Sequence, residues 1–130
     1  MIVFIDTSDF NNLHFALVNG RDVKEFSAAV AFNENYKTNE LLEKFLTKSK
    51  VAPAQLTKVV VCSGPGSFTG IRVGVSLAQA LGFALSVPVI AIPKSKVPHN
   101  FEKLADLKSG KNIIVNYGQK PNITKAKKNK

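Results

Sequence analysis

A glycine-rich run after a short apolar segment carries the residue types best suited to chemistry. Four apolar residues, Val59–Cys62, precede the run Ser63–Gly74, which reads SGPGSFTGIRVG. A turn of this kind that opens a helix presents backbone N–H groups and can hold an anion. The run lacks the Gly-Lys-Ser/Thr ending of a Walker loop, and its glycines miss the dinucleotide-binding spacing by one residue. Two interpretations stay open, a phosphate-binding loop or a tight turn capped by Ser67 or Thr69. The candidate phosphate contacts in this run are Gly64, Gly66, Ser67 and Thr69.

A second polar cluster, Asp6-Thr7-Ser8, follows the apolar start of the chain. A carboxylate at the end of a strand could orient Mg²⁺ or water, with the adjacent hydroxyls close to a phosphate. The alternative is an Asx or Ser/Thr turn that closes the strand. Both interpretations stay open, and either places Asp6, Thr7 and Ser8 beside the start of the next element.

Histidine and cysteine are too scarce to suggest a catalytic or metal centre. Cys62, His14 and His99 are the complete set, which is too small for a zinc cluster. Cys62 ends an apolar run and is expected to be a small buried hydrophobe. Neither histidine has an acid or nucleophile nearby in the sequence that suggests catalysis. We therefore predict no catalytic residue, no metal site and no cofactor.

The helix expected over residues 69–86 is unusually rich in small and apolar side chains. A small residue recurs every four positions along it: Gly70, Gly74, Ala78 and Gly82. Each helical glycine costs roughly 1 kcal/mol relative to alanine, so a sheet or another helix must approach this stripe closely. The polar side chains form one narrow line: Arg72, Ser76 and Gln79. A helix this apolar is normally covered on several sides, so we predict that a protein partner covers part of it.

Hydrophobic periodicity predicts the elements that position these residues. Residues 2–5, 13–18 and 23–32 are expected to form three strands joined by short turns, with Asn19-Gly20 in the second turn. A helix at 38–50 is expected to be capped by Thr38 or a neighbour and ended by Pro53. Buried strands at 59–62 and 89–92 flank the helix at 69–86, which implies a parallel crossover in an α/β fold. A short helix at 99–107 and a strand at 112–117 complete the prediction.

Length and charge indicate one domain with a basic end. The chain has 130 residues, of which 45% are hydrophobic, as expected of a single globular domain. Its apolar start lacks the basic region of a signal peptide, so we expect a soluble protein of the cytoplasm. The formal net charge is +9, and residues 94–130 contribute +8 through ten lysines and two acidic residues. We predict a domain over residues 1–117 and a disordered, lysine-rich tail over 118–130 that either solubilises the protein or attracts RNA.

The run Gly64–Gly74 closely resembles the TsaB family of bacterial tRNA threonylcarbamoyladenosine biosynthesis proteins. Ile5–Ser8, Thr38–Leu46 and Leu77–Pro88 are also similar to that family, so the resemblance extends over roughly residues 1–95. It implies one actin-like (ribonuclease-H-like) domain, in which a three-stranded antiparallel meander leads into strand–helix crossovers in a mixed sheet. It also implies a non-catalytic accessory subunit that binds the catalytic subunit TsaD, with the ATPase TsaE joining. The complex modifies the adenosine beside the anticodon of certain tRNAs.

The resemblance further implies where a partner binds. In similar proteins the two long helices pack against the equivalent pair of TsaD, and we expect a homodimer through the same surface when the chain is alone. The predicted interface residues are Leu41, Leu42, Phe45, Gly70, Arg72, Gly74, Ala78 and Gly82. Contact with tRNA is expected only through the complex, or weakly through the lysine-rich tail.

The sequence departs from the family in length, since relatives usually carry a second actin-like domain and this chain is expected to lack it. An actin-like nucleotide site lies between two domains, so the candidate phosphate contacts are expected to be remnants. Two alternatives stay open beside the accessory subunit. One is a small ATP-binding or phosphotransfer protein on the same half-fold, and the other is a basic RNA-binding module.

Overall fold

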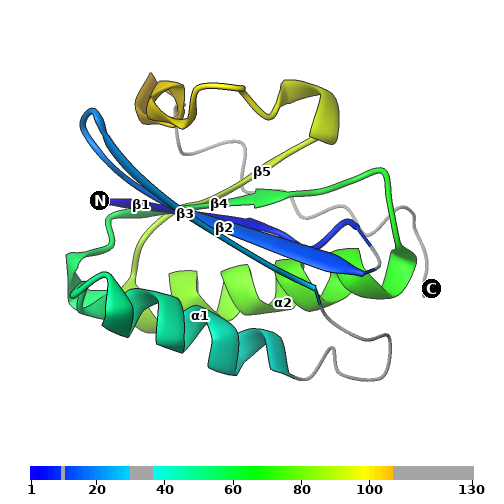
Figure 1. The fold of residues 1–130 in the computed structure, drawn as a ribbon, viewed down its shortest axis with the longest axis horizontal. Coiled ribbons are helices and arrows are strands. Elements are labelled where there is room, and N and C mark those ends of the chain that lie inside the picture. The colour runs from blue at the N-terminus through cyan, green and yellow to red at the C-terminus, as the bar shows by residue number, and fades with distance from the viewer. Residues whose placement is uncertain (10, 30–36, 107–130) are drawn as a thin grey trace.

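The protein is built around a mixed sheet of five strands, seen edge-on in Figure 1. The computed structural model describes residues 1–9, 11–29 and 37–106. The strand order is β3-β2-β1-β4-β5, so the first strand lies at the centre. The strands are β1 (Ile2–Asp6), β2 (Asn12–Asn19), β3 (Asp22–Ala29), β4 (Lys58–Cys62) and β5 (Val89–Ile92).

The first three strands form the predicted antiparallel meander. In register, β1 pairs with β2 from Ile2 opposite Val18, and β2 pairs with β3 along its whole length. Gly20 turns the chain between β2 and β3 with φ of +63°, a left-handed conformation that glycine adopts at little cost. The third strand was predicted to extend to residue 32, and residues 30–36 lie outside the described residues.

The remaining two strands confirm the predicted parallel crossovers. β4 runs parallel to β1, with Val59 opposite Val3, and β5 runs parallel to β4. Val59, Val60, Val61 and Cys62 are fully buried, as expected of a strand covered on both faces. The carboxyl ends of β1, β4 and β5 therefore meet at one edge of the sheet, which we call the carboxyl edge.

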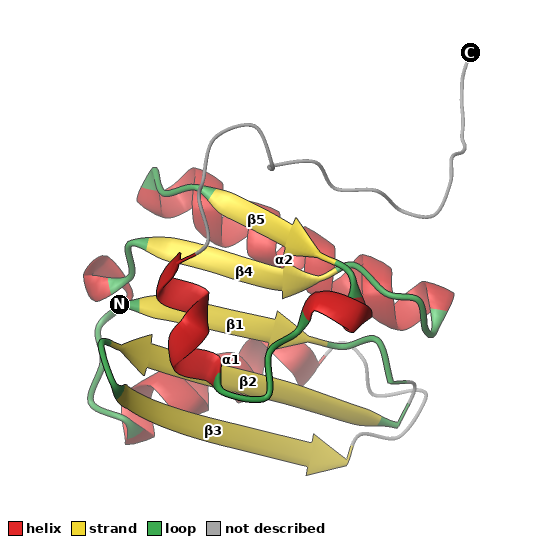
Figure 2. Cartoon of the chain, turned by 90° about the horizontal axis from the view of Figure 1, so that it is seen from above, coloured by secondary structure: helices red, strands yellow, loops and turns green. Residues whose placement is uncertain are grey.

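The two α-helices cover one face of the sheet, and short 3-10 segments cover the other. Figure 2 shows α1 (Thr38–Lys48) and α2 (Phe68–Leu85) behind the sheet, with η3 (Lys94–Lys96) and η4 (Phe101–Asp106) in front of it. A further 3-10 turn, η2 (Pro53–Gln55), precedes β4. The predicted short helix at 99–107 thus takes the form of η4. The predicted strand at 112–117 and the tail at 118–130 lie outside the described residues.

Each face of the sheet has its own hydrophobic core. On the helix side, Phe15, Phe26 and Phe45 stack in a triangle with ring centroids 5.6–6.2 Å apart. On the other side, Phe4, Ile90 and Leu104 are almost fully buried, and Leu104 brings η4 onto the sheet. Burial of aromatic and β-branched residues on both faces supplies the main driving force for this arrangement.

The sequence predicted the start of α1 better than its end. Lys37, the neighbour of Thr38, is the cap residue of α1, and Thr38 is the first helical residue and is buried. The helix ends at Lys48, and Lys50 adopts φ of +59° while the Val51 N–H donates to the Leu46 carbonyl at 2.9 Å. Pro53 therefore does not end α1, because the chain has already left the helix through a left-handed residue.

Candidate functional site

The carboxyl edge brings together most of the polar residues that the sequence singled out. Asp6 ends β1 and is followed by Thr7 and Ser8, and the glycine-rich run follows β4. Lys94 follows β5 and reaches the same place, since its Nζ lies 2.9 Å from the Ser8 Oγ. Lys94 was not among the residues predicted from the sequence. It could have been found as a lysine two residues after a buried parallel strand, at the edge where the carboxyl ends of neighbouring strands meet.

Ser8 is the centre of this cluster. Its side chain is 2% exposed, and its N–H and hydroxyl both donate to the Asp6 Oδ1, at 2.9 and 2.6 Å. The Lys94 ammonium has only donors, so the Ser8 hydroxyl accepts from Lys94 and gives its own proton to Asp6. The Ser8 carbonyl accepts from the Ser67 N–H at 2.7 Å. All the polar atoms of Ser8 thus have partners within the protein.

Three glycines bring α2 and its preceding turn unusually close to the end of β1. A Cβ added to Gly66 would lie under 3.0 Å from the Ser8 carbonyl oxygen. A Cβ on Gly70 or Gly74 would lie as close to the Thr7 carbonyl oxygen or hydroxyl, respectively. The Thr7 hydroxyl in turn donates to the Gly70 carbonyl. The glycine spacing is therefore explained by close packing between α2 and its own β1.

This packing corrects the predicted partner interface. Gly70, Gly74, Ala78 and Gly82 are all buried, and a Cβ on Gly82 would collide with the Val89 side chain in β5. Leu42 and Phe45 are buried in the helix-side core. These six residues face the protein's own sheet and core. Of the predicted set, Arg72 is exposed and Leu41 is partly exposed, so these two reach the surface.

The glycine-rich run forms the tight turn that was one of its two interpretations. Ser67 caps α2, because its hydroxyl accepts from the Gly70 N–H at 3.0 Å and its carbonyl accepts from the Ile71 N–H at 2.9 Å. The Ser67 N–H is itself bound to Ser8. The N–H groups of Ser67, Gly70 and Ile71 thus have acceptors within the protein. The structure brings Asp6, Ser8, Gly66 and Ser67 together, and anion binding by them stays a prediction.

Cys62 lies under the same edge and is buried, as predicted. Its Sγ is 3.9 Å from the Ser8 Oγ, to which the thiol can donate. Burial raises the pKa of the Cys62 thiol above the ordinary value of 9.0, and the Asp6 carboxylate adds to that shift. A thiol that resists ionisation is a poor nucleophile, which fits a packing role.

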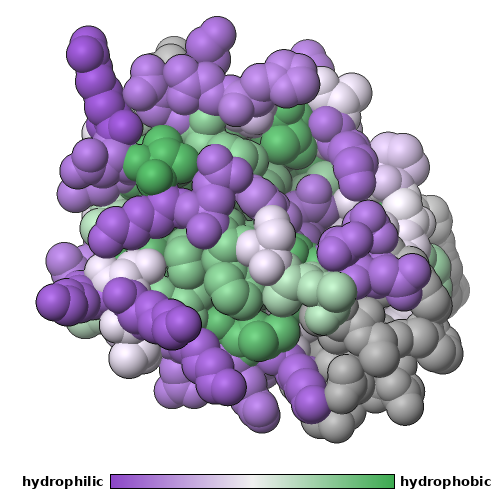
Figure 3. Space-filling view, viewed as in Figure 1, coloured by the Kyte–Doolittle hydropathy of each residue, from purple (hydrophilic) through white to green (hydrophobic). Residues whose placement is uncertain are grey.

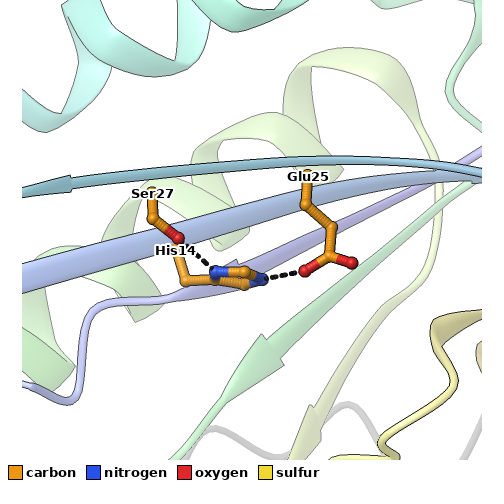
Figure 4. A network of polar contacts seen from close by, with 3 residues as sticks. All are labelled: His14, Glu25 and Ser27. Carbon is orange, nitrogen blue, oxygen red and sulfur yellow. Dashed lines mark hydrogen bonds and ion pairs between the residues drawn. The ribbon is translucent and has the colours of Figure 1, made fainter.

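The two histidines lie away from these contacts. The ring of His14 is held on β2 by two residues of β3, with Nδ1 2.8 Å from the Ser27 Oγ and Nε2 3.2 Å from the Glu25 Oε1 (Figure 4). It also stacks on Phe101 of η4, with centroids 5.5 Å apart. His99 is exposed in the loop before η4. Among residues 1–9, 11–29 and 37–106, no three His, Cys, Asp or Glu side chains are placed to share a metal ion.

The surface of α2 that points away from the sheet, its outer face, is the second notable region. Phe68 is 60% exposed and Phe83 is 90% exposed, and the Arg72 guanidinium lies 5.1 Å from the Phe68 ring centroid. A groove of about 700 Å³ runs along this face beside the start of α1. Its lining residues are Asn39, Thr69, Arg72, Val73, Ser76, Leu77 and Ala80.

Apolar side chains also reach the surface at another face of the molecule. Figure 3 shows apolar side chains gathered in the middle of the face where α1 and β3 lie, with polar side chains around them. Phe26, Ala28 and Leu41 are partly buried side chains packed on the core there. Of the described helices, α2 alone is long and apolar enough to cross a membrane by length and composition. Here its small residues are packed on the sheet instead.

Comparison with known proteins assigns the chain to a family. The family model described as "TsaD: tRNA N6-adenosine threonylcarbamoyltransferase" matches residues 30–102, which include α1, α2, β4 and β5. The chain belongs to this family. It is similar to the tRNA threonylcarbamoyladenosine biosynthesis protein TsaB of Bacillus subtilis, with 36% identity over 92 residues. TsaB of Buchnera aphidicola (Schizaphis graminum) is 29% identical over 92 residues.

These matches cover 70% and 71% of this chain, and 40% and 43% of the two relatives. The chain thus spans about two fifths of the length of the curated TsaB proteins it matches. The resemblance to TsaB that the sequence indicated is confirmed, over part of the relatives' length.

Solved structures confirm the fold. YeaZ from Pseudomonas aeruginosa superposes with a TM-score of 0.65 at 25% identity, over 71% of this chain and 43% of YeaZ. RuvC of Thermus thermophilus superposes with a TM-score of 0.51 at 12% identity, over 75% of this chain and 68% of RuvC, which supports the fold alone. The predicted α/β, ribonuclease-H-like domain with a meander and parallel crossovers is therefore correct.

Proposed function

We propose that the chain is a cytoplasmic, non-catalytic accessory subunit in tRNA threonylcarbamoyladenosine biosynthesis. In this proposal it binds a TsaD-like catalytic subunit, and a TsaE-like ATPase joins the complex. The observation that carries the proposal is the 36% identity to Bacillus subtilis TsaB over 92 residues. The family match over residues 30–102 supports it, because that segment contains both helices that border the groove.

The proposed docking surface is the outer face of α2 together with the adjoining side of α1. Phe68 and Phe83 are the two large apolar residues that the described part of the chain exposes most, and exposed apolar surface rimmed by polar groups is typical of sites of protein association. Hydroxyl, amide and guanidinium groups line the groove on this face together with apolar side chains, as at many interfaces with an apolar centre and a polar rim. This surface replaces the glycine stripe, which faces inward.

The same surface would hold two copies of the chain together when the partner is absent. Two helix pairs that pack face to face would bury about 1,600 Å², the area typical of a stable protein interface. One surface cannot hold both a second copy and a TsaD-like subunit, so the heterodimer would displace the homodimer. We expect the isolated protein to be a dimer at tens of micromolar.

The contacts at the carboxyl edge favour an accessory role over the alternative phosphotransfer activity. Thr7 and Ser8 are buried, and their hydroxyls donate to Gly70 and Asp6, respectively. The Ser67 N–H donates to Ser8. Groups that would have to contact a nucleotide are thus used to attach α2 to β1. The RNA-binding alternative depends on the lysine-rich tail, which lies outside the described residues, and it stays a prediction from charge.

Co-purification with the TsaD-like protein of the same cell tests the proposal. Size-exclusion chromatography with light scattering should give a homodimer for the chain alone and a heterodimer, with loss of the homodimer, after the partner is added. Calorimetry with ATP and Mg²⁺ should detect no micromolar binding by the chain alone. A strict monomer in both samples, or ATP turnover by the isolated chain, would contradict the accessory role.

A further inference from the structure

Lys94 makes two contacts that connect β5 to the other strands of the carboxyl edge. Its backbone N–H donates to the Gly64 carbonyl at 2.7 Å, just after β4. Its ammonium donates to the Ser8 hydroxyl at 2.9 Å, just after β1. One residue therefore holds together the segments that leave three neighbouring parallel strands.

The contact between Lys94 and Ser8 is connected to the start of α2 through further hydrogen bonds made by Ser8 and Ser67. Ser8 is held from one side by Lys94 and from the other by the Asp6 carboxylate. The Ser8 carbonyl accepts from the N–H of Ser67, and Ser67 caps α2 through Gly70. Thr69 and Arg72, which line the groove, lie in the first turns of the same helix.

We propose that Lys94 is a positioning residue for the docking surface. Its ammonium fixes Ser8, and Ser8 fixes the first turn of α2, so that Thr69 and Arg72 keep the geometry of the groove. Lys94 makes no part of the groove itself, since the described groove lining lies on the first residues of α1 and on α2. The inference rests on the proposed function for its effect on binding, whereas the positioning step can be measured on the isolated chain.

Charge explains why this lysine is suited to the task. Asp6 is a partly exposed carboxylate that accepts two hydrogen bonds from Ser8. The Ser8 hydroxyl accepts from a cation and donates to a carboxylate, so both hydrogen bonds of this hydroxyl are charge-assisted, which strengthens them. A neutral, apolar side chain at position 94 would remove the ammonium that donates to the buried Ser8 hydroxyl. Ser8 would then be held less firmly, and the hydrogen bond from the Ser67 N–H to its carbonyl would weaken. The backbone bond from residue 94 to Gly64 would remain.

Hydrogen exchange on the full chain tests the positioning step directly. In Lys94→Met the Ser67 amide should exchange about tenfold faster than in the wild type. The carbonyl of Ser8 accepts from this amide, and the substitution removes the hydrogen bond between the Ser8 hydroxyl and a charged group. Amides in the β2–β3 hairpin should be unchanged. Lys94→Arg keeps a cation with donors and should restore slow exchange at Ser67. Lys96→Met, an exposed lysine in the same 3-10 turn, is the matched control and should behave as wild type.

Binding to the TsaD-like protein is the second measurement. Lys94→Met should weaken the affinity several-fold, whereas Lys94→Arg and Lys96→Met should leave it unchanged. Unchanged Ser67 exchange in Lys94→Met would overturn the inference, whatever the partner does. Unfolding of both Lys94→Met and Lys94→Gln would also overturn it, because the residue would then support the whole fold. If the wild type does not bind the partner, the proposed function fails while altered exchange at Ser67 still supports the positioning step.

Discussion

The two sides of α2 differ sharply, although one run of eighteen residues contains both. The inner side is built from small residues that lie against Thr7 and Val89 with no room for a methyl group at the three helical glycines. The outer side carries two exposed phenylalanines and a groove with one guanidinium. The inner side explains why the helix is so rich in glycine, and the outer side explains why it remains so apolar.

The comparison shows that two unrelated requirements determine the residues of α2, one on each side of the helix. Glycine on the inner side costs helix propensity, and the close approach of β1 and β5 offsets that cost by burying the sheet. Phe83 on the outer side gains little within the monomer, because its side chain is 90% exposed to water. Substitutions on the inner side should therefore change folding, and substitutions on the outer side should change association.

The largest effect on the free energy of unfolding is expected from Gly70→Ala on the inner side. The new Cβ would meet the Thr7 carbonyl oxygen, a backbone atom that cannot move without shifting β1. Overpacking of this kind should lower the free energy of unfolding by about 2–3 kcal/mol, measured by urea denaturation. Ser76→Ala on the outer side is the control and should change it by less than about 0.5 kcal/mol. Equal stability of the two variants would remove the distinction between the two sides.

A smaller effect is expected from the ionisation of Cys62 beneath the carboxyl edge. Its pKa in the folded protein is raised above 9.0, so the unfolded chain ionises first as the pH rises. The free energy of unfolding should be unaffected below pH 9.0 and should fall above it, by at most about 1.4 kcal/mol per pH unit, until the folded thiol also ionises. In Cys62→Ala, denaturation curves recorded from about pH 8 to about pH 11 should lack this contribution to the fall of the free energy of unfolding with pH. Identical slopes would show that the thiol ionises equally in both states.

The smallest effect on the fold is expected from deletion of residues 119–130. Five of these residues are lysines and few are apolar, so neither side of α2 should change. The unfolding midpoint should stay the same. Any RNA affinity should fall steeply with added salt in the full chain and less steeply in the deletion, in filter-binding or fluorescence assays. Loss of cooperative unfolding in the deletion would instead assign the tail a structural role.

The sequence predicted the helices and strands better than it predicted which segments they contact. The apolar strand segments, the helical spacing of Leu41 to Leu46 and a cap at Ser67 or Thr69 depend on nearby residues, and each was predicted near its place. The sequence left open whether a sheet or another helix approaches the glycine stripe, because period alone does not distinguish the two, and the structure places the sheet there. Lys94 was missed because its contacts lie at Ser8 and Gly64, which only the parallel strand order brings near.

The most direct test of the account is the affinity of the TsaD-like protein for Phe83→Ser. Phe83 is 90% exposed, so the substitution should leave the free energy of unfolding within about 0.5 kcal/mol of wild type. An apolar anchor at an interface should nevertheless cost about tenfold or more in affinity when it is removed. Lys103→Ser, exposed on η4 across the sheet, should bind as wild type. Equal Kd values for Phe83→Ser, Lys103→Ser and wild type would contradict the docking surface assigned to α2.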